Sequence, residues 1–308
     1  MLSFVSKRVL GAIPTLFAIL TIAFFMIRLA PGGPFSSERA VPPEIQANLD
    51  RVYHLDRPLM LQYWHYLEGV LVGDFGPSFS YKNSSVTELI WGGFPASMQL
   101  GFTAVFLAIL IGSALGTLAA LRQNRTTDYA VMAGAMTGIT IPNFVMAPLL
   151  TLVFGVYLRV LPAGGWGDGY QIQYKILPIV ALALPQIAYV ARLTRGSMIE
   201  VLRSNYIRTA RAKGLSEWLT ITRHAARAAL LPVVSYLGPA SAGVITGSVV
   251  IEKIFSIPGI GRYFIQGALN RDYTLVMGVV IFYAVLIIAF NLIVDVLYGV
   301  LDPKLSHR

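Results

Sequence analysis

Six long stretches without a charged residue are the main pattern of this 308-residue sequence. They cover residues 9–27, 89–121, 129–158, 176–191, 228–251 and 273–294. A helix that crosses a bilayer needs ~20 predominantly apolar residues, so the pattern predicts six transmembrane helices. The second and third stretches exceed one crossing, and each is expected to hold one helix plus interfacial turns. The fourth is the shortest, and it can span if Lys175 and Arg192 extend their charged ends outward or if the bilayer thins.

The composition also indicates a lipid environment. Hydrophobic residues make up 56% of the chain and charged residues 13%, about half the ~25% of an ordinary soluble domain. This excludes a soluble enzyme, a disordered chain and a disulfide-stapled secreted domain. The chain has no cysteine, which excludes disulfides, thiolate metal sites and iron–sulfur clusters. The predicted fold class is an all-α polytopic membrane protein.

The distribution of charge predicts the orientation, because cytoplasmic loops of membrane proteins are rich in Lys and Arg. Residues 192–227 hold eight basic and two acidic residues, whereas residues 30–88 hold four basic and seven acidic ones. Placing both termini in the cytoplasm is the assignment that fits this asymmetry. The net charge of +9 is therefore typical of a membrane protein, and no nucleic-acid partner is expected. The first stretch could be a signal peptide, but its length favours an uncleaved helix.

The external segment contains one candidate amphipathic helix. Asp56 is expected to cap it ahead of Pro58, and Gly73 to end it. Apolar residues recur between them at helical spacing: Leu59, Tyr63, Leu67 and Val70. Two roles stay open for this segment, a spacer that packs the rim of the helix bundle and a gate for a substrate.

The basic segment between the fourth and fifth stretches predicts a helix–glycine–helix elbow. Residues 205–213 form a short helix with basic residues in its last turn, and Gly214 stops it. Ser216 and Glu217 then begin a second helix. A loop attracted to anionic lipid is the simpler interpretation, but two capped helices favour a docking surface for a partner protein.

The sequence contains no recognisable catalytic or energy-supplying motif. No Lys follows a Gly, so no phosphate-binding G-x-x-x-x-G-K-[ST] loop is present. The four histidines are scattered singly, and no catalytic or metal-binding residue is predicted. Proton-driven carriers usually keep ionisable residues in mid-membrane, and the apolar stretches hold none. Energy for transport is therefore expected to come from elsewhere.

Several motifs resemble those of type I ABC import permeases. The elbow sequence Arg208-Thr-Ala-Arg-Ala-Lys-Gly214 is similar to the EAA-x-x-x-G coupling loop of that family. Arg208 replaces the glutamate of the general pattern, and Thr209 replaces its first alanine. Residues 54–63, 73–79, 257–261 and 270–273 look like motifs of the peptide/nickel branch. The resemblance covers nearly the whole chain and is greatest to the B-type membrane subunit of bacterial oligopeptide importers.

The resemblance implies an organisation and a set of partners. Residues 1–29 form an N-terminal transmembrane helix, 30–93 an extracytoplasmic segment, 94–300 a five-helix core with the elbow at 197–227, and 301–308 a cytoplasmic tail. The implied partners are a homologous second permease subunit, two ABC ATPase subunits that bind ATP and Mg, and an extracytoplasmic peptide-binding protein. The implied location is the bacterial inner membrane. The residues implied to couple to the ATPases are Arg208, Thr209, Ala210, Arg211, Ala212, Lys213 and Gly214.

A route for peptides needs polar lining, because an unsatisfied backbone group in hydrocarbon costs several kcal/mol. Prolines 142, 148, 178 and 185 are expected to form joints that face other helices or this route. Polar candidates for the lining are Thr137, Thr140, Asn143, Gln186, Ser235, Ser241, Thr246 and Ser248. Alternatively, these hydroxyls bond to their own helix or join neighbouring helices. Import of dipeptides or nickel chelates, an ATP-independent peptide carrier and a membrane scaffold are the competing functions.

Overall fold

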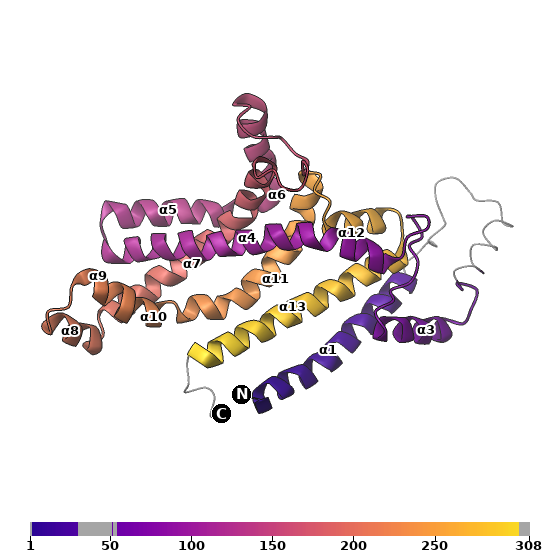
Figure 1. Ribbon diagram of the computed structural model, residues 1–308, viewed down its shortest axis with the longest axis horizontal. Coiled ribbons are helices and arrows are strands. Elements are labelled where there is room, and N and C mark those ends of the chain that lie inside the picture. Colours follow the sequence, from indigo (N-terminus) through magenta and orange to yellow (C-terminus); the bar gives the residue numbers. More distant parts are fainter. Residues whose placement is uncertain (1, 30–50, 52–53, 302–308) are drawn as a thin grey trace. The chain divides into compact units, whose positions relative to one another are not determined.

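The computed structural model describes residues 2–29, 51 and 54–301, and within them leaves out the side chains of residues 2–5, 246, 247 and 298–301 (Figure 1). This part of the chain is almost entirely helical, and its single β-bridge joins Pro77 and Ser85. The predicted all-α fold class is confirmed. The predicted tail after residue 301 and most of residues 30–53 lie outside the described residues. The cytoplasmic location of both termini stays a prediction.

Five of the described helices are long and apolar enough to cross a membrane. They are α1 (Leu2–Leu29), α4 (Val86–Leu121), α7 (Gln173–Leu202), α11 (Leu231–Ile254) and α13 (Tyr273–Leu301). A sixth candidate is a bent pair, α5 (Thr126–Thr140) and α6 (Asn143–Leu150), which continues as the π-helix η1 (Thr151–Tyr157). The six predicted apolar stretches therefore each correspond to a helix or to this pair.

The third stretch does not form one helix, because its two halves meet at an angle of 104°. The cause is Pro142, which has no N–H to donate and disfavours helical geometry in the residue before it. Ile141 accordingly has an extended backbone (φ −88°, ψ 116°), and Asn143 begins α6. The predicted joint at Pro142 is confirmed. Helix α7, in contrast, continues through Pro178 and Pro185.

The fourth stretch becomes the middle of a helix of 30 residues. Lys175 does not extend outward at its start, since its side chain is buried. The ammonium donates to Gln99 Oε1 at 3.0 Å and to the Gly169 carbonyl at 2.5 Å, and it lies 4.8 Å from the centre of the Trp166 ring. Internal partners therefore satisfy this charge.

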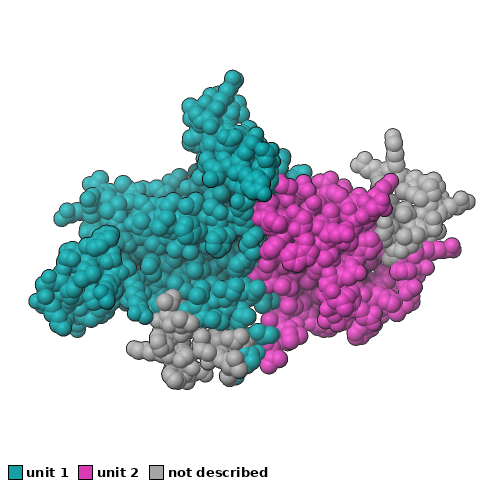
Figure 2. All heavy atoms as spheres, in the orientation of Figure 1, with its two compact units in different colours: residues 1–9, 98–257, 287–308 teal, residues 10–97, 258–286 magenta. Residues whose placement is uncertain are grey.

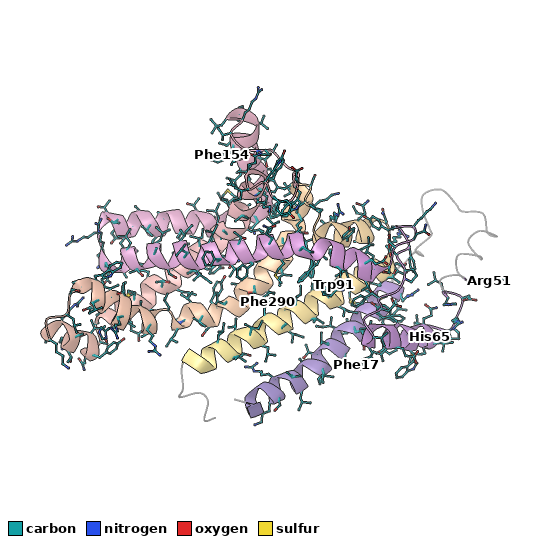
Figure 3. All side chains as sticks on the ribbon, in the orientation of Figure 1. Phe17, Arg51, His65, Trp91, Phe154 and Phe290 are labelled. Atoms are coloured by element: carbon teal, nitrogen blue, oxygen red, sulfur yellow. The ribbon has the colours of Figure 1, made fainter. Side chains whose placement is uncertain are left out.

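The helices form two compact units, coloured separately in Figure 2. Unit 1 contains Met1–Val9, Met98–Ile257 and Ile287–Arg308, and unit 2 contains Leu10–Ser97 and Pro258–Leu286. The division follows packing rather than chain order. It does not test the predicted boundaries at residues 29/30, 93/94 and 300/301, which stay predictions. Figure 3 shows large apolar side chains along the helices; Phe17 of α1 and Trp91 of α4 are 50% and 59% exposed.

In unit 2, the predicted amphipathic helix is α3 (Leu59–Leu71). Tyr63 is buried, and its hydroxyl lies 2.8 Å from Thr21 Oγ1. Leu59, Leu67 and Val70 pack against the same cluster, which includes Leu20, Phe24, Met277 and Ile281. The predicted cap at Asp56 is wrong, because the helix begins directly after Pro58, whose fixed φ suits that position. Gly73 ends the segment with φ +79°, as predicted.

Hydrogen bonds to a buried aspartate anchor the start of α13 in unit 2. Helix α13 follows the short helix α12 (Ile260–Leu269). Asp272 is fully buried and accepts from Ser78 Oγ at 2.5 Å, from the Ser80 N–H at 2.9 Å and from the Leu275 N–H at 3.1 Å. The Thr274 hydroxyl donates to the Pro77 carbonyl at 2.6 Å. Residues of two motifs far apart in the sequence, 73–79 and 270–273, are thereby bonded together.

In unit 1, glycines allow α7 to approach its neighbours closely. A Cβ atom on Gly112 of α4 would lie 2.7 Å from Val190 Cβ, and one on Gly116 would overlap the Ala191 carbonyl oxygen. A Cβ atom on Gly138 of α5 would lie 3.1 Å from the Leu184 carbonyl oxygen. Small residues at such positions let helix backbones pack tightly within a membrane. Helix α7 is thus held against both α4 and α5.

Candidate functional site

The predicted elbow is present at the end of α7 (Figure 1). Its first arm is α8 (Asn205–Ala212), and its second arm comprises α9 (Glu217–Leu219), the π-helix η2 (Thr220–Ala225) and α10 (Ala226–Ala229). Gly214 lies between them with φ +77°, a left-handed geometry that favours glycine. Ser216 begins the second arm, and its hydroxyl accepts from the Leu219 N–H at 3.4 Å. The helix–glycine–helix prediction is confirmed.

One face of the elbow is anchored in the core of unit 1. Ile207 and Ala210 of α8 are buried. They belong to a cluster with Ala120 of α4, Met198 of α7, Ala225 of η2 and Ala229 of α10. The alanine side chains of this cluster let α8 lie close to its neighbouring elements. Movement of α8 is therefore tied to movement of α7.

The other face is exposed and basic. Arg208, Thr209, Arg211, Ala212, Lys213 and Gly214 are exposed, whereas Ala210 is 6% exposed and faces the anchor. Arg211 also has an internal role, because its guanidinium donates to both carboxylate oxygens of Glu217, at 2.8 and 3.2 Å. This pair joins the two arms across Gly214. Sequence reasoning treated Glu217 only as a helix start, and it missed Trp218, which is 77% exposed beside the pair.

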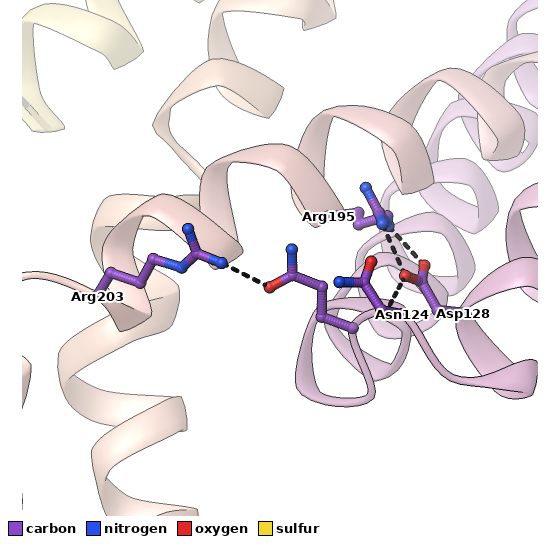
Figure 4. Close-up of polar contacts among 5 residues, drawn as sticks. Asn124, Asp128, Arg195 and Arg203 are labelled. Atoms are coloured by element: carbon purple, nitrogen blue, oxygen red, sulfur yellow. Dashed lines mark hydrogen bonds and ion pairs between the residues drawn. The ribbon is translucent and has the colours of Figure 1, made fainter.

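Two polar contacts join the C-terminal part of α7 to the first turn of α5 and to the turn before it (Figure 4). Arg195 donates to Asp128 through Nε at 2.5 Å and through Nη2 at 2.6 Å. Arg203 Nη2 donates to Gln123 Oε1 at 3.1 Å. Sequence reasoning missed Asp128, because it lies one residue before the third charge-free stretch. Arg195 was counted only as one of the cytoplasmic positive charges.

The hydroxyls proposed to line a peptide route bond mainly to their own helices. Their acceptors are carbonyl groups three or four residues earlier, at 2.7–3.3 Å, for Thr137, Thr140, Ser235, Ser241 and Ser248. Gln186 joins two helices, since its Oε1 accepts from the Tyr236 hydroxyl of α11 at 2.8 Å. Asn143 is at the bend after α5. The side chain of Thr246 lies outside the described residues.

The candidate route residues differ in their exposure. Thr137, Thr140 and Ser235 are exposed, whereas Ser248 is buried. The five hydroxyls above therefore form the intrahelical hydrogen bonds of the alternative interpretation. A peptide route along these residues stays a prediction. In the described part of the chain, no three His, Asp or Glu side chains come together in a way that could hold a metal ion.

Comparison with known proteins identifies the family that these features resemble. Residues 112–307 match the family described as binding-protein-dependent transport system inner membrane component, and residues 1–101 match the corresponding N-terminal family. The chain is 57% identical over 307 residues to the oligopeptide transport system permease protein OppB of Escherichia coli (strain K12), with 100% of both chains covered. It is 45% identical to the dipeptide transport system permease protein DppB of Bacillus subtilis (strain 168), with 99% of this chain and 98% of that one covered.

Solved structures show the same fold at low sequence identity. A crystal structure of an amino acid ABC transporter with histidines matches with a TM-score of 0.53 at 18% identity, covering 69% of this chain and 94% of the other. The MetNI methionine ABC transporter in inward-facing conformations matches with a TM-score of 0.55 at 16% identity, covering 70% and 96%. The resemblance stated from the sequence motifs is confirmed.

Proposed function

Because the chain belongs to the family of binding-protein-dependent transport system inner membrane components, we propose that it is the permease subunit of an ABC importer for oligopeptides. It is a multi-pass protein of the inner membrane. The substrate class is inferred from 57% identity over the full length to an oligopeptide permease protein. Dipeptide import is the second candidate, since a dipeptide permease protein is 45% identical over nearly the same length.

The elbow is the observation that supports ATP-driven transport. Its exposed face offers basic and aromatic side chains to a partner, and its buried face packs on α7 through Ile207 and Ala210. A partner that moves the elbow would therefore move α7, which is a packed transmembrane element rather than a flexible loop. Rigid packed elements of this kind transmit small displacements because they have few alternative arrangements.

We also propose a division of labour among the subunits of the importer. This chain carries no phosphate-binding loop, and ATP and Mg would bind in two ATPase subunits docked at the elbows, as the family resemblance implies. A homologous second permease subunit would complete the membrane pathway, and an extracytoplasmic binding protein would deliver the peptide. We assign this subunit no catalytic residue. The coupling residues would be those of the elbow, Arg208 to Gly214.

The bent pair α5–α6 is the element best suited to change shape during transport. Non-helical backbone at membrane depth is tolerated where it is covered by protein or lines a water-filled cavity. Ile141 and Pro142 form such a segment, and the candidate Asn143 follows directly. We propose that this bend lies on the peptide route, together with the exposed Thr137 and Thr140 on the preceding turns of α5.

Uptake by proteoliposomes tests the proposal. The subunit is co-purified with its partners and reconstituted, and uptake of a labelled pentapeptide is measured with binding protein present. An ABC importer requires ATP and continues when a proton gradient is collapsed. Uptake that needs only a proton gradient would identify a secondary carrier, and no peptide uptake under either condition would favour a scaffold. Competition between dipeptides and pentapeptides then separates the two candidate substrates.

A further inference from the structure

A largely buried ion pair joins Asp128 of α5 to Arg195 of α7. Asp128 is 1% exposed, and the Arg195 side chain is 28% exposed. Both guanidinium contacts are short, at 2.5 and 2.6 Å, and both carboxylate oxygens are used. A two-point contact of this kind fixes the orientation of both side chains as well as their separation.

The turn before α5 is built to hold this carboxylate. The Asn124 N–H donates to Asp128 Oδ2 at 2.9 Å. Asn124 has φ +60°, in the left-handed region that asparagine tolerates better than most residues, and this geometry directs its N–H toward Asp128. Asp128 also lies in the first turn of α5, where a negative charge is favourable at the helix N-terminus. Three features of the chain thus converge on one buried carboxylate.

The pair joins the element that carries the elbow to the element that bends. Arg195 lies two helical turns before α7 ends, and α8 follows after a short turn. Asp128 is 12 residues before the end of α5 at Thr140, about 18 Å along the helix at ~1.5 Å per residue, and Pro142 follows directly after Ile141. At that far end, α5 meets α7 where Gly138 packs against the Leu184 backbone and the Ala188 side chain. Van der Waals packing at Gly138 is not directional, whereas the ion pair fixes the orientation of both side chains, and separating a buried ion pair is strongly unfavourable.

We infer that Asp128 and Arg195 are positioning residues that transmit displacement of the elbow to α5 and to the bend at Pro142. The inference rests on the proposed function, and it adds a connection between the ATPase side and the peptide route. A displaced elbow moves α7 through the anchor of Ile207 and Ala210, and the ion pair makes α5 follow. Without the pair, α7 moves and α5 lags behind, so ATP is hydrolysed with little peptide moved.

The test measures peptide uptake and ATP hydrolysis in the same proteoliposomes and reports their ratio. Asp128→Asn keeps the shape of the side chain and removes its charge. Arg195→Lys keeps the charge and removes the two-point contact. The exchange Asp128→Arg with Arg195→Asp restores a pair of opposite charges. Asp295→Asn is the matched control, since Asp295 forms a more exposed ion pair with Arg8 at 3.2 Å in the same unit.

We expect Asp128→Asn and Arg195→Lys to lower the peptide-to-ATP ratio about tenfold, the usual size of a coupling between sites. The exchanged pair should recover a substantial part of the ratio, and Asp295→Asn should leave it unchanged. A purely structural role would reduce the amount of assembled complex without changing the ratio per complex.

Two results would overturn the inference. One is a wild-type ratio in Asp128→Asn and Arg195→Lys, whatever their yield. The other is failure of all three variants to assemble with their partners, because the pair would then serve assembly and not coupling. Failure of the proposed function is seen separately, as a lack of ATP-driven peptide uptake by the unmodified assembly.

Discussion

Gly214 is the position where a single substitution should most directly test the elbow. Its φ of +77° is one that residues with a Cβ adopt at a cost, and no heavy atom beyond Gly214 and its two chain neighbours lies within 4 Å of the position that a Cβ would occupy. Any effect of substitution must therefore come from the backbone conformation and not from a clash. Alanine should cost about 1 kcal/mol, and the β-branched valine about 1–3 kcal/mol. Asparagine should cost least among the three.

These costs compare directly with the interactions that hold the turn closed. The Gly214 N–H donates to the Arg211 carbonyl at 2.9 Å, and the Leu215 N–H donates to the Ala210 carbonyl at 3.3 Å. The Arg211–Glu217 pair is exposed, so we expect it to add less than about 1 kcal/mol. A cost of about 2 kcal/mol in Gly214→Val exceeds that contribution and would reduce the closed form of the turn roughly thirtyfold relative to the open form.

The assay separates insertion from docking. The abundance of each variant in membranes measures insertion, co-purification of the ATPase subunits measures docking, and ATP-driven peptide uptake measures function. We expect equal insertion and a loss of docking and uptake that increases from Asn to Ala to Val. Gly196→Val is the control, because Gly196 on α7 also has no neighbour within 4 Å of a Cβ and has ordinary helical geometry.

Two outcomes would refute this reasoning about Gly214. Normal docking and uptake by Gly214→Val would show that the left-handed turn is not needed. Equal damage by asparagine and valine would show that some property other than backbone conformation is responsible.

Further substitutions probe other parts of the chain. Gly116→Ala should destabilise the protein by about 1–3 kcal/mol, because the added methyl group forces α4 away from α7, and thermal inactivation in detergent should be faster. Gly134→Ala is the control, since open space surrounds that position. Equal effects of the two substitutions would argue against close packing at Gly116. Asp272→Ala should speed protease cleavage within residues 74–85, because it removes four hydrogen bonds that anchor this segment and the start of α13. Unchanged cleavage would contradict that anchor. Thr137→Cys should react faster with a membrane-impermeant thiol reagent during turnover, while the buried Ser248→Cys stays unreactive; no change at Thr137 would place the peptide route elsewhere.

The sequence predicted elements whose signals are local. Apolar stretches and the turn residue Gly214 depend on neighbours within a few positions, and both were found where expected. The partners of Lys175 and Arg195 could not be predicted, because charge counting treats every cation as solvated at the membrane surface. Both charges are satisfied by groups from other helices. The 104° angle of the bend could not be predicted for a related reason. Pro142 indicates a break in the helix, but the angle depends on how the two halves pack.

The close packing of α7 against α4 and α5 has a consequence for how the chain enters the membrane. Of the five candidate spans, α7 has the largest buried share, and it carries Lys175 and Arg195 along its length. Their partners, Gln99 and Asp128, lie on α4 and α5, which are synthesised earlier. A nascent α7 therefore meets helices that already present its acceptors. In a permuted chain that made α7 first, both cations would lack these partners until α4 and α5 were made, and biogenesis would depend on the order of synthesis.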